Sequence, residues 1–337
     1  MFRIAGFGTA LGAPSPVADT VAEYSEDTDR VLGYGYRTVH RAPADVQVSD
    51  LAHDAALAAL AEAGAAAAEV NLLVLALTDL SEYLYWDAAA ALQHRLGAPG
   101  AEAVLITQAC TAALAGLTLA AGRFATHPDY ETALIVGASR CCEQYWNRMQ
   151  TQSMVFSDGA TAVVARRGPG AVRWRASHAC TDGRFADFYR MDVGGAANPF
   201  SAGDTSGQPH ARDAWDIMEF FDYDDERLDG FTRLIDERTR EVVDRACERA
   251  GVRRDALARV VFLHDNVRAI TSMAAALGVP LDRTNLEIGL DAGHLGAADQ
   301  LYSLQRLLAD GSLAPGDLVA LVGLGRGMHW ACTLVEI

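Results

Sequence analysis

The sequence predicts an α/β protein in which two halves repeat one order of strands and helices. Residues 72–77 form an unbroken apolar run, which is typical of a strand buried on both faces of a sheet that helices cover. Residues 257–264 resemble residues 68–75, and residues 318–325 match residues 132–137. In both halves the first of these strands precedes the later one by about sixty residues. These repeats predict a duplicated fold with a pseudo-twofold axis.

The repeat divides the chain into a half at 1–170 and a half at 171–337. Between them, residues 181–230 are irregular, rich in glycine at first and then acidic and aromatic. We interpret this stretch as a lid or entrance wall with some helix. A plain surface insertion is the alternative.

Further elements of the first half follow from local signals. Arg3 to Gly8 is expected to be the opening strand. Ser49 to Ala63 has apolar residues at helical spacing, with Ser49 as the expected N-cap. Asp87 to Leu96 is expected to be a helix that ends at Gly97.

Composition restricts the classes of function. The net charge of −16 argues against nucleic acid as a partner, because phosphate binding requires clustered Lys and Arg. The six cysteines are scattered without a metal-ligand spacing, which indicates a reducing compartment, no disulfide framework and no metal site. The N-terminus lacks the pattern of a signal peptide, and the apolar runs are short, Ala-rich or broken by charge. We therefore expect a cytoplasmic protein without a transmembrane span.

The central feature of the first half is Cys110. It lies where an apolar, β-branched run at 104–107 changes into a long run of Ala, Leu and Gly. The first run favours a buried strand and the second a helix, so Cys110 is placed at a strand-to-helix turn. Unpaired N–H groups and the positive end of the helix dipole favour a thiolate there. The sequence thus indicates a nucleophile, although free cysteine is also common in protein cores.

A cysteine nucleophile requires a base, and the second half offers two histidines. His264 ends an apolar strand, where binding residues are expected in an open α/β sheet. His294 lies between Gly293 and Leu295, just ahead of a helix. Asp299 follows in the first turns of that helix, among apolar neighbours, and a buried carboxylate requires a partner. We expect Asp299 to hold and polarise His264 or His294, as carboxylates do in catalytic triads.

A glycine-rich turn at 323–330 follows the last strand of the repeat, and its glycines allow close backbone approach. The N–H groups of Gly327 and Cys110 are the expected oxyanion hole. A simple turn between two strands is the alternative interpretation.

Several of these segments together resemble the β-ketoacyl-ACP synthase III family, which has the thiolase fold. They are Gln108-Ala-Cys-Thr-Ala-Ala, Phe156-Ser-Asp-Gly-Ala, His264-Asp-Asn, the Gly293 turn and Gly325-Arg-Gly-Met-His-Trp. The similarity covers nearly the whole chain in the right order. It implies thiolase-like duplicated α-β-α-β-α layers with two halves related by a pseudo-twofold axis.

In that family a cysteine takes an acyl group from coenzyme A or acyl carrier protein. A histidine and an asparagine then help to decarboxylate a malonyl thioester, whose carbanion attacks the acyl group. Residue by residue, the resemblance assigns the nucleophile to Cys110, the histidine to His264 and the oxyanion donor to Gly327.

The sequence departs from the family where Gly-Asn-Thr is replaced by Gly293-His294-Leu295. The segment that follows resembles a branch of acyltransferases in antibiotic biosynthesis, of which the cervimycin malonyltransferase is one member. That branch uses a Cys–His–Asp set, and Asp299 fits the aspartate. A carboxylate opposes the negative charge of a thioester enolate, whereas acyl transfer to a hydroxyl needs the strong base that a His–Asp pair supplies.

The leading hypothesis is a ping-pong acyltransferase in which Cys110 is acylated and His264, backed by Asp299, deprotonates a hydroxyl or thiol acceptor. The alternative is a decarboxylative β-ketoacyl synthase, in which His264 and His294 share the donor role. A third hypothesis is a degenerate partner subunit kept for assembly. An intact Cys110, two histidines and the glycine turn argue against the third.

No permanently bound cofactor is expected, and the donor would be acyl-CoA or phosphopantetheinyl acyl carrier protein. The expected partners are the carrier protein, a small-molecule acceptor and a second copy in a homodimer. Arg37 and Arg268 are candidates for contacts to the carrier or to the phosphopantetheine phosphate. The resemblance places Tyr85 and Trp86 at the acyl pocket, across a dimer interface, and adds Asn266 as a binding residue.

Overall fold

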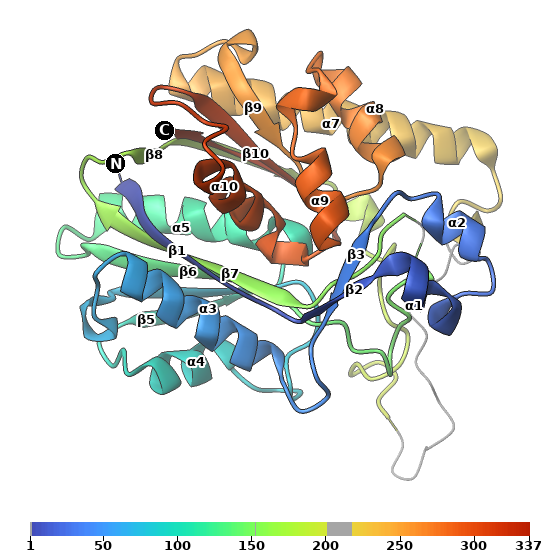
Figure 1. Cartoon of the computed structure of the whole chain (residues 1–337), viewed down its shortest axis with the longest axis horizontal. Helices are drawn as coiled ribbons and strands as arrows, with labels where there is room; N and C mark the ends of the chain where they lie inside the picture. Colours follow the sequence, from blue (N-terminus) through green and yellow to red (C-terminus); the bar gives the residue numbers. More distant parts are fainter. Residues whose placement is uncertain (1, 152, 201–217) are drawn as a thin grey trace.

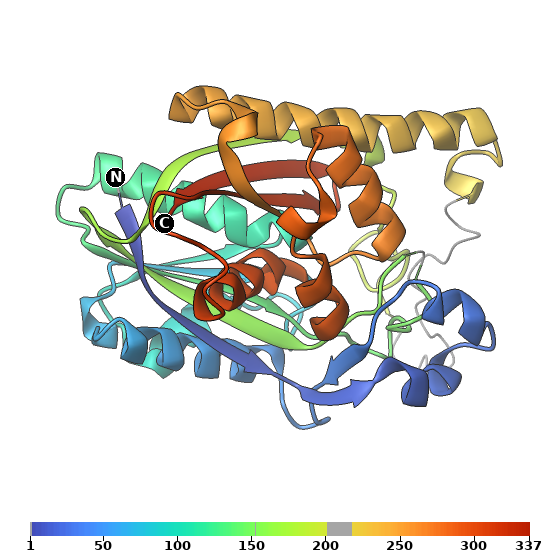
Figure 2. The ribbon, with the colours of Figure 1, turned by 45° about the horizontal axis from the view of Figure 1, so that its top comes forward.

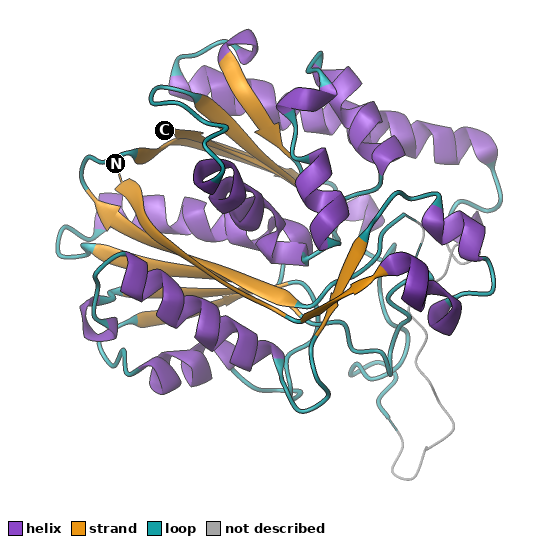
Figure 3. Ribbon diagram, in the orientation of Figure 1, coloured by secondary structure: helices purple, strands orange, loops and turns teal. Residues whose placement is uncertain are grey.

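Strands from both halves of the chain lie in one mixed sheet, shown in Figures 1 and 3. The computed structural model describes residues 2–151, 153–200 and 218–337. Within them the long sheet has nine strands in the order β5-β4-β6-β7-β1-β8-β11-β10-β9, and β2 and β3 form a separate pair. The strands are β1 Phe2–Leu11, β2 Ala13–Pro16, β3 Thr38–Arg41, β4 Leu72–Leu77, β5 Glu102–Ile106, β6 Thr132–Ser139, β7 Gly159–Arg167, β8 Val172–Thr181, β9 Leu257–Val261, β10 Leu318–Gly325 and β11 His329–Glu336.

The pairing of these strands repeats between the halves. In the first half β4 runs parallel to β6, β6 antiparallel to β7, and β7 antiparallel to β1. In the second half β9 runs parallel to β10, β10 antiparallel to β11, and β11 antiparallel to β8. The two sets meet at β1 and β8, and the loop between β7 and β8 contains residue 170. The predicted α/β class with two duplicated halves is confirmed.

The sheet has a first part, β5-β4-β6-β7-β1, and a second part, β8-β11-β10-β9, and the helices form three layers around them. Figure 1 shows α5 and α10 between them, α3 and α4 outside the first part, and α7 and α8 outside the second. The turned view in Figure 2 shows α7 running along the outside of the second part. The helices are α1 Val17–Tyr24, α2 Thr28–Leu32, α3 Val48–Glu62, α4 Ala88–Leu96, α5 Ala112–Thr126, α7 Asp225–Ala250, α8 Val267–Leu277, α9 Leu286–Ala292 and α10 Asp299–Ala309.

The two faces of β4 explain its unbroken apolar sequence. Leu72 and Val74 pack in the central cluster with α5 and α10, whereas Leu73 and Leu75 pack with α3 and α4. Because side chains alternate across a strand, a strand covered on both faces requires apolar residues at every position.

Two local predictions are wrong in detail. The strand before Cys110 is β5, which is half-buried because it lies at the edge of the sheet, with β4 on one side. Helix α3 begins at Val48, and its N-cap is Gln47 in place of Ser49. Asp50 accepts a 2.8 Å hydrogen bond from the backbone N–H of Gln47, which fixes the earlier start. By contrast, α4 ends as predicted at Gly97, which has a φ of 70°.

The segment at 181–230 is described only in part, since residues 201–217 lie outside the described residues. Its described part begins with a short 3₁₀ turn at Gly183–Phe185 and continues to the start of α7. Phe185, Phe188 and Phe221 pack on Phe231 of α7.

The segment Ala109–Thr126 is long and apolar enough by composition to cross a membrane. It comprises the turn that carries Cys110 and helix α5, and more than half of it is buried. Its position in the central layer accounts for the apolar composition.

A pair of glycine substitutions tests this packing. Helix α3 lies so close to β1 that a Cβ on Gly8 would stand 2.1 Å from the carbonyl oxygen of Ala55. Gly8→Ala is therefore expected to destabilise the fold by about 1–3 kcal/mol. Gly122→Ala is the matched control, because it lies in α5 with open space around it, and it should stabilise by about 0.5–1 kcal/mol. Thermal unfolding measures both, and equal melting temperatures would contradict the packing of α3 on β1.

Candidate active site

Cys110 lies in a 3₁₀ turn, Ala109–Thr111, between β5 and α5. Ala109, just before it, has a φ of 49°, a left-handed conformation that is strained for a residue with a side chain. The end of β10 approaches this turn closely. A Cβ on Gly325 would lie 2.5 Å from the carbonyl oxygen of Gln108, so only glycine fits there. The glycine-rich turn and the Cys110 turn are thus in direct contact.

The structure brings three of the predicted residues together. The Sγ of Cys110 lies 3.1 Å from Nε2 of His294. The Nδ1 of His294 lies 2.7 Å from Oδ2 of Asp299, off the ring N–H direction, so this contact acts chiefly as an ion pair. His294 and Asp299 are fully buried, and Cys110 is 8% exposed. A nucleophile, a base and an orienting carboxylate therefore follow one another in the order of a catalytic triad.

Asp299 is the first residue of α10, where the helix dipole favours a negative charge. Its Oδ1 accepts the backbone N–H of Leu295 at 2.7 Å, and its Oδ2 accepts the backbone N–H of His264 at 2.8 Å. The ion pair with His294 and the 3.2 Å contact between its Oδ1 and Nδ1 of His264 complete its surroundings. These contacts compensate the burial of the carboxylate.

His264 is turned away from the thiol. Its Nδ1 lies 2.8 Å from the carbonyl oxygen of Gly293 and 3.2 Å from Oδ1 of Asp299, so this nitrogen carries the proton. Its Nε2 lies 2.8 Å from Oγ of Ser303, which can donate to it. Both ring nitrogens are thus occupied. The expectation that His264 faces Cys110 as the base is wrong, because the segment after β9 directs its ring toward Gly293 and Ser303.

The pKa values follow this arrangement. Burial alone would lower the pKa of His294, but Asp299 and Cys110 raise it well above the usual value. Burial lowers the pKa of His264, which Asp299 only partly offsets. Burial would raise the pKa of Asp299, yet the two histidines hold it below its usual value. The geometry therefore favours a charged His294, a neutral His264 and an ionised Asp299.

The segment Phe156–Gly159 holds the turn that carries His294. The backbone N–H of Ser157 donates to the carbonyl of His294 at 2.9 Å, and the N–H of His294 donates to the carbonyl of Val155 at 2.8 Å. The ring of Phe156 meets the ring of His294 edge to face, with 5.0 Å between centroids. A Cβ on Gly293 would lie 2.2 Å from Oγ of Ser157, so this contact requires glycine. The segment Phe156–Gly159 therefore fixes the position of the His294 ring.

A cavity of about 440 Å³ opens on Cys110 and His294. Its wall combines the ends of β4 and β10, the loop at 143–154 and part of the segment at 181–230. The other lining residues are Thr78, Asp79, Leu80, Ala109, Glu143, Gln144, Tyr145, Trp146, Asn147, Gln150, Thr151, Ser153, Met154, Phe156, Tyr189, Met191, Leu263, Leu324, Gly325, Arg326 and Met328. No group of His, Cys, Asp and Glu among the described residues could hold a metal ion.

Three predicted binding residues lie outside this cavity. Asn266 caps α8, where its side chain accepts the backbone N–H of Ala269, so its role is structural. Arg37 forms ion pairs with Glu287 and Asp291 on the surface. Arg268 is exposed near the start of α8.

The remaining predicted residues also do not line the cavity of this chain. Tyr85 is fully exposed, at the tip of the loop between β4 and α4. Trp86 packs against the outer cluster of α3 and α4. Gly327 lies between two lining residues, Arg326 and Met328, and has a φ of 135°, which favours glycine.

The sequence interpretation missed several groups that the structure places at the cavity. Thr78 and Asp79 directly follow β4, and binding residues are common at the carboxyl ends of parallel strands, so that rule identifies them. Arg326 lies in the glycine-rich turn, which the sequence analysis singled out only for its backbone, and Trp146 lies on a loop that no sequence signal marks.

Comparisons with known proteins give a consistent result. Residues 104–183 match the family described as 3-oxoacyl-[acyl-carrier-protein (ACP)] synthase III, and residues 247–337 match its C-terminal part. A β-ketoacyl-[acyl-carrier-protein] synthase III of Rhodospirillum rubrum is 33% identical over 99% of this chain and 98% of its own length.

Solved structures agree with this result. ChlB3, described as an acyltransferase, superposes with a TM-score of 0.87 at 26% identity, over 100% of this chain and 97% of its own. The 3-oxoacyl-[acyl-carrier-protein] synthase III of Aquifex aeolicus superposes with a TM-score of 0.81 at 21% identity, over 100% of both chains, which shows the shared fold.

Alkylation of Cys110 distinguishes the two histidines. His294→Asn is expected to slow alkylation by iodoacetamide at pH 7 about tenfold, because it removes the cation beside the sulfur. His264→Asn, the matched control, should change the rate less than about twofold. Peptide mapping follows Cys110 separately from the other cysteines. Equal slowing in both variants would contradict the assignment of His294.

The raised pKa of His294 also predicts how stability depends on pH. Stability from a histidine whose pKa is raised by folding is fully present below the unfolded value, about 6.5, and is lost as the pH rises through the folded value. The melting temperature of the wild type minus that of His294→Asn should therefore be larger at pH 6 than at pH 9. A difference that grows with pH would mean that His294 is buried neutral.

Proposed function

The chain belongs to the β-ketoacyl-[acyl-carrier-protein] synthase III family, and within it we propose that this protein is an acyltransferase. It accepts an acyl group from an acyl carrier protein or coenzyme A thioester on Cys110. It then transfers this group to a hydroxyl or to another carrier thiol, in a ping-pong reaction of secondary metabolism such as antibiotic biosynthesis. The observation that carries the proposal is the sequence of contacts from Cys110 through His294 to Asp299.

In the first step the sulfur of Cys110 attacks the thioester carbonyl. An imidazolium at hydrogen-bonding distance favours the thiolate form of a cysteine. The bond from the acyl carbon to Sγ forms, the bond to the donor sulfur breaks, and His294 gives its proton to the leaving thiolate. Asp299 holds the imidazole in place and stabilises its charged form.

We assign the oxyanion hole to the backbone N–H groups of Cys110 and Gly327. The close contact of the Gly325 turn with the Cys110 turn supports this assignment. Backbone donors held by packed turns need no reorganisation when charge develops on the carbonyl oxygen.

In the second step His294, now neutral, takes the proton of the acceptor as the acceptor oxygen or sulfur attacks the acyl carbon. The bond from that carbon to Sγ then breaks, which releases the product and restores the Cys110 thiolate beside a protonated His294. The ion pair with Asp299 makes His294 a stronger base than a free imidazole. The same carboxylate disfavours an enolate, because two negative charges would share a buried site. The replacement of the family's asparagine by His294 therefore supports acyl transfer over condensation.

The second candidate is decarboxylative condensation, a starter-unit reaction that forms a carbon–carbon bond with a malonyl thioester. The relative from Rhodospirillum rubrum favours it, since that protein is named a synthase. The acyltransferase ChlB3 favours transfer.

We also propose that the protein works with an acyl carrier protein and as a cytoplasmic homodimer. The edge strand β5 is half-buried with an apolar sequence, and Tyr83, Leu84 and Tyr85 are exposed at a loop tip. A second copy that covers these apolar groups would bring Tyr85 and Trp86 near an interface. Arg268, exposed and without an ion pair among the described residues, is a candidate contact for the acidic carrier.

Intact-mass analysis tests the reaction. With a panel of acyl-CoA and acyl carrier protein thioesters, the wild type should gain the mass of one acyl group, and Cys110→Ala should gain none. Acyl-enzyme given a hydroxyl or thiol acceptor should lose that mass without releasing carbon dioxide. Carbon dioxide release with a β-ketoacyl product would establish the condensing alternative, and the absence of an adduct from every donor would contradict both.

A further inference from the structure

Asp79 is a carboxylate in the wall of the cavity that the mechanism above does not use. Asp79 follows Thr78 at the carboxyl end of β4 and is only 8% exposed. The Oγ1 of Thr78 accepts the backbone N–H of Ala297 at 2.6 Å, in the turn between His294 and Asp299. Asp79 and Cys110 line the same cavity. Asp79 therefore stands close to the reacting centre.

The hydrogen-bond partners of Asp79 are all neutral. Its Oδ1 accepts the backbone N–H of Leu80 at 2.7 Å, and its Oδ2 accepts Nε1 of Trp146 at 2.9 Å and the N–H of Cys142 at 3.3 Å. No ion pair to Asp79 is present among the residues that the structure describes. Burial accordingly raises its pKa, in spite of these bonds. The hydrogen bonds thus fix the position of the Asp79 carboxylate, but no positive side chain forms an ion pair with it in the described part of the chain.

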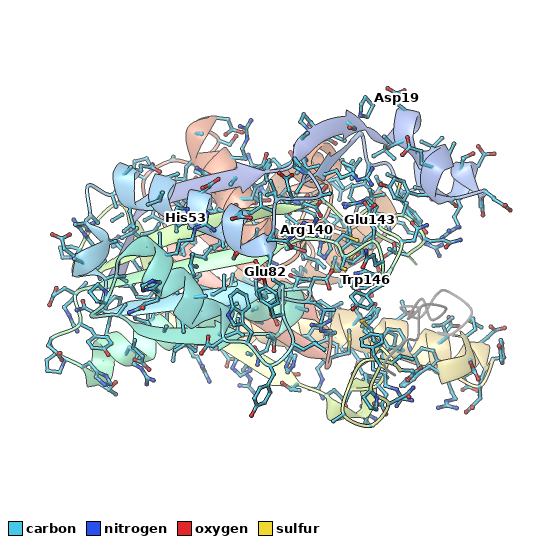
Figure 4. The ribbon with its side chains drawn as sticks, turned by 90° about the horizontal axis from the view of Figure 1, so that it is seen from below. Asp19, His53, Glu82, Arg140, Glu143 and Trp146 are labelled. Carbon is cyan, nitrogen blue, oxygen red and sulfur yellow. The ribbon has the colours of Figure 1, made fainter. Side chains whose placement is uncertain are left out.

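Glu143, a second acid in the cavity wall, provides the contrast. It forms ion pairs with Arg148 at 2.6 Å and Arg41 at 2.7 Å, so its charge is offset. Figure 4 shows Glu143 and Trp146, which come from the same loop, on one side of the molecule. Among the acids that line the described cavity, Asp79 is therefore the one whose charge a bound acyl group would meet.

The one arginine among the lining residues is Arg326. Its side chain is partly exposed, so water and salt weaken its field, whereas the buried charge of Asp79 acts through a less polar medium. Arg326 does lower the pKa of Asp79, but its effect is smaller than that of burial and of the three hydrogen bonds to that carboxyl. The potential beside Asp79 consequently remains negative.

We propose that Asp79 is a specificity-determining residue that rejects anionic acyl groups, so that the donors of this enzyme are thioesters of neutral acyl groups. The proposal rests on the acyl-enzyme of the proposed function. A carboxylate-bearing acyl group would bring a second negative charge into a desolvated wall, where like charges repel strongly. Malonyl would meet the charge of Asp79, and this disfavours it as a starter and as an extender.

The test compares two thioesters that are close in shape and differ in charge, malonyl- and acetoacetyl-N-acetylcysteamine. Their use removes any dependence on a carrier. Intact mass follows acylation of Cys110 with time, and an acetyl adduct formed from malonyl by decarboxylation counts as malonyl loading. The wild type should load acetoacetyl about tenfold faster or more. Asp79→Asn keeps the shape of the side chain and removes its charge. It should reduce the ratio of acetoacetyl to malonyl loading rates about tenfold, while the acetoacetyl rate stays within about threefold of the wild-type rate.

Asp87→Asn is the matched control. Asp87 caps α4 on the same loop, is exposed and does not line the cavity, so the substitution removes one charge without changing the cavity. Its loading ratio should equal that of the wild type.

Three outcomes would overturn the proposal. Equal or faster malonyl loading by the wild type would assign charge selection to Arg326. An equal loss for both thioesters in Asp79→Asn would show that Asp79 only positions Trp146. The same narrowing in Asp87→Asn would show a general effect of net charge. If no thioester acylates the wild type, the proposed function itself fails, and this result differs from all three.

Discussion

The buried carboxylate of Asp299 is the constraint on which the site depends. It joins α10, the segment after β9 and the turn after α9 through hydrogen bonds from His264 and Leu295 and an ion pair with His294. A fully buried carboxylate is stable only when donors and an opposite charge surround it. The same contacts that stabilise the negative charge set the protonation of both histidines. Asp299 therefore contributes both to the stability of the site and to the reactivity of His294.

The duplicated fold explains how groups distant in the sequence come together. Helices α5 and α10 occupy equivalent places in the central layer, and each begins next to a reacting residue. Cys110 precedes α5, while Asp299 begins α10. Glycines at 293 and 325 then allow the connecting turns to approach without a steric clash. The internal symmetry thus brings the starts of α5 and α10 together, and the residues that differ between the two halves form the reacting group.

Residue patterns predicted the duplicated sheets, the Cys110 turn and the pairing of Asp299 with one of two histidines. They could not determine which histidine faces the sulfur, because both follow buried elements and only packing directs His264 toward Ser303. Asn266 had a plausible motif but serves as a helix cap. Asp79 was missed because its importance lies in the neutral character of its partners, which come from a distant loop.

The central claim is that Asp299 keeps His294 charged beside Cys110 and leaves His264 neutral. Nitrogen-15 NMR of the protein labelled at histidine measures this directly, with His294→Asn and His264→Asn to assign the signals. At pH 7 the ring of His294 should show two protonated nitrogens, and the ring of His264 should show a proton on Nδ1 alone. A neutral His294 together with a charged His264 would contradict the account.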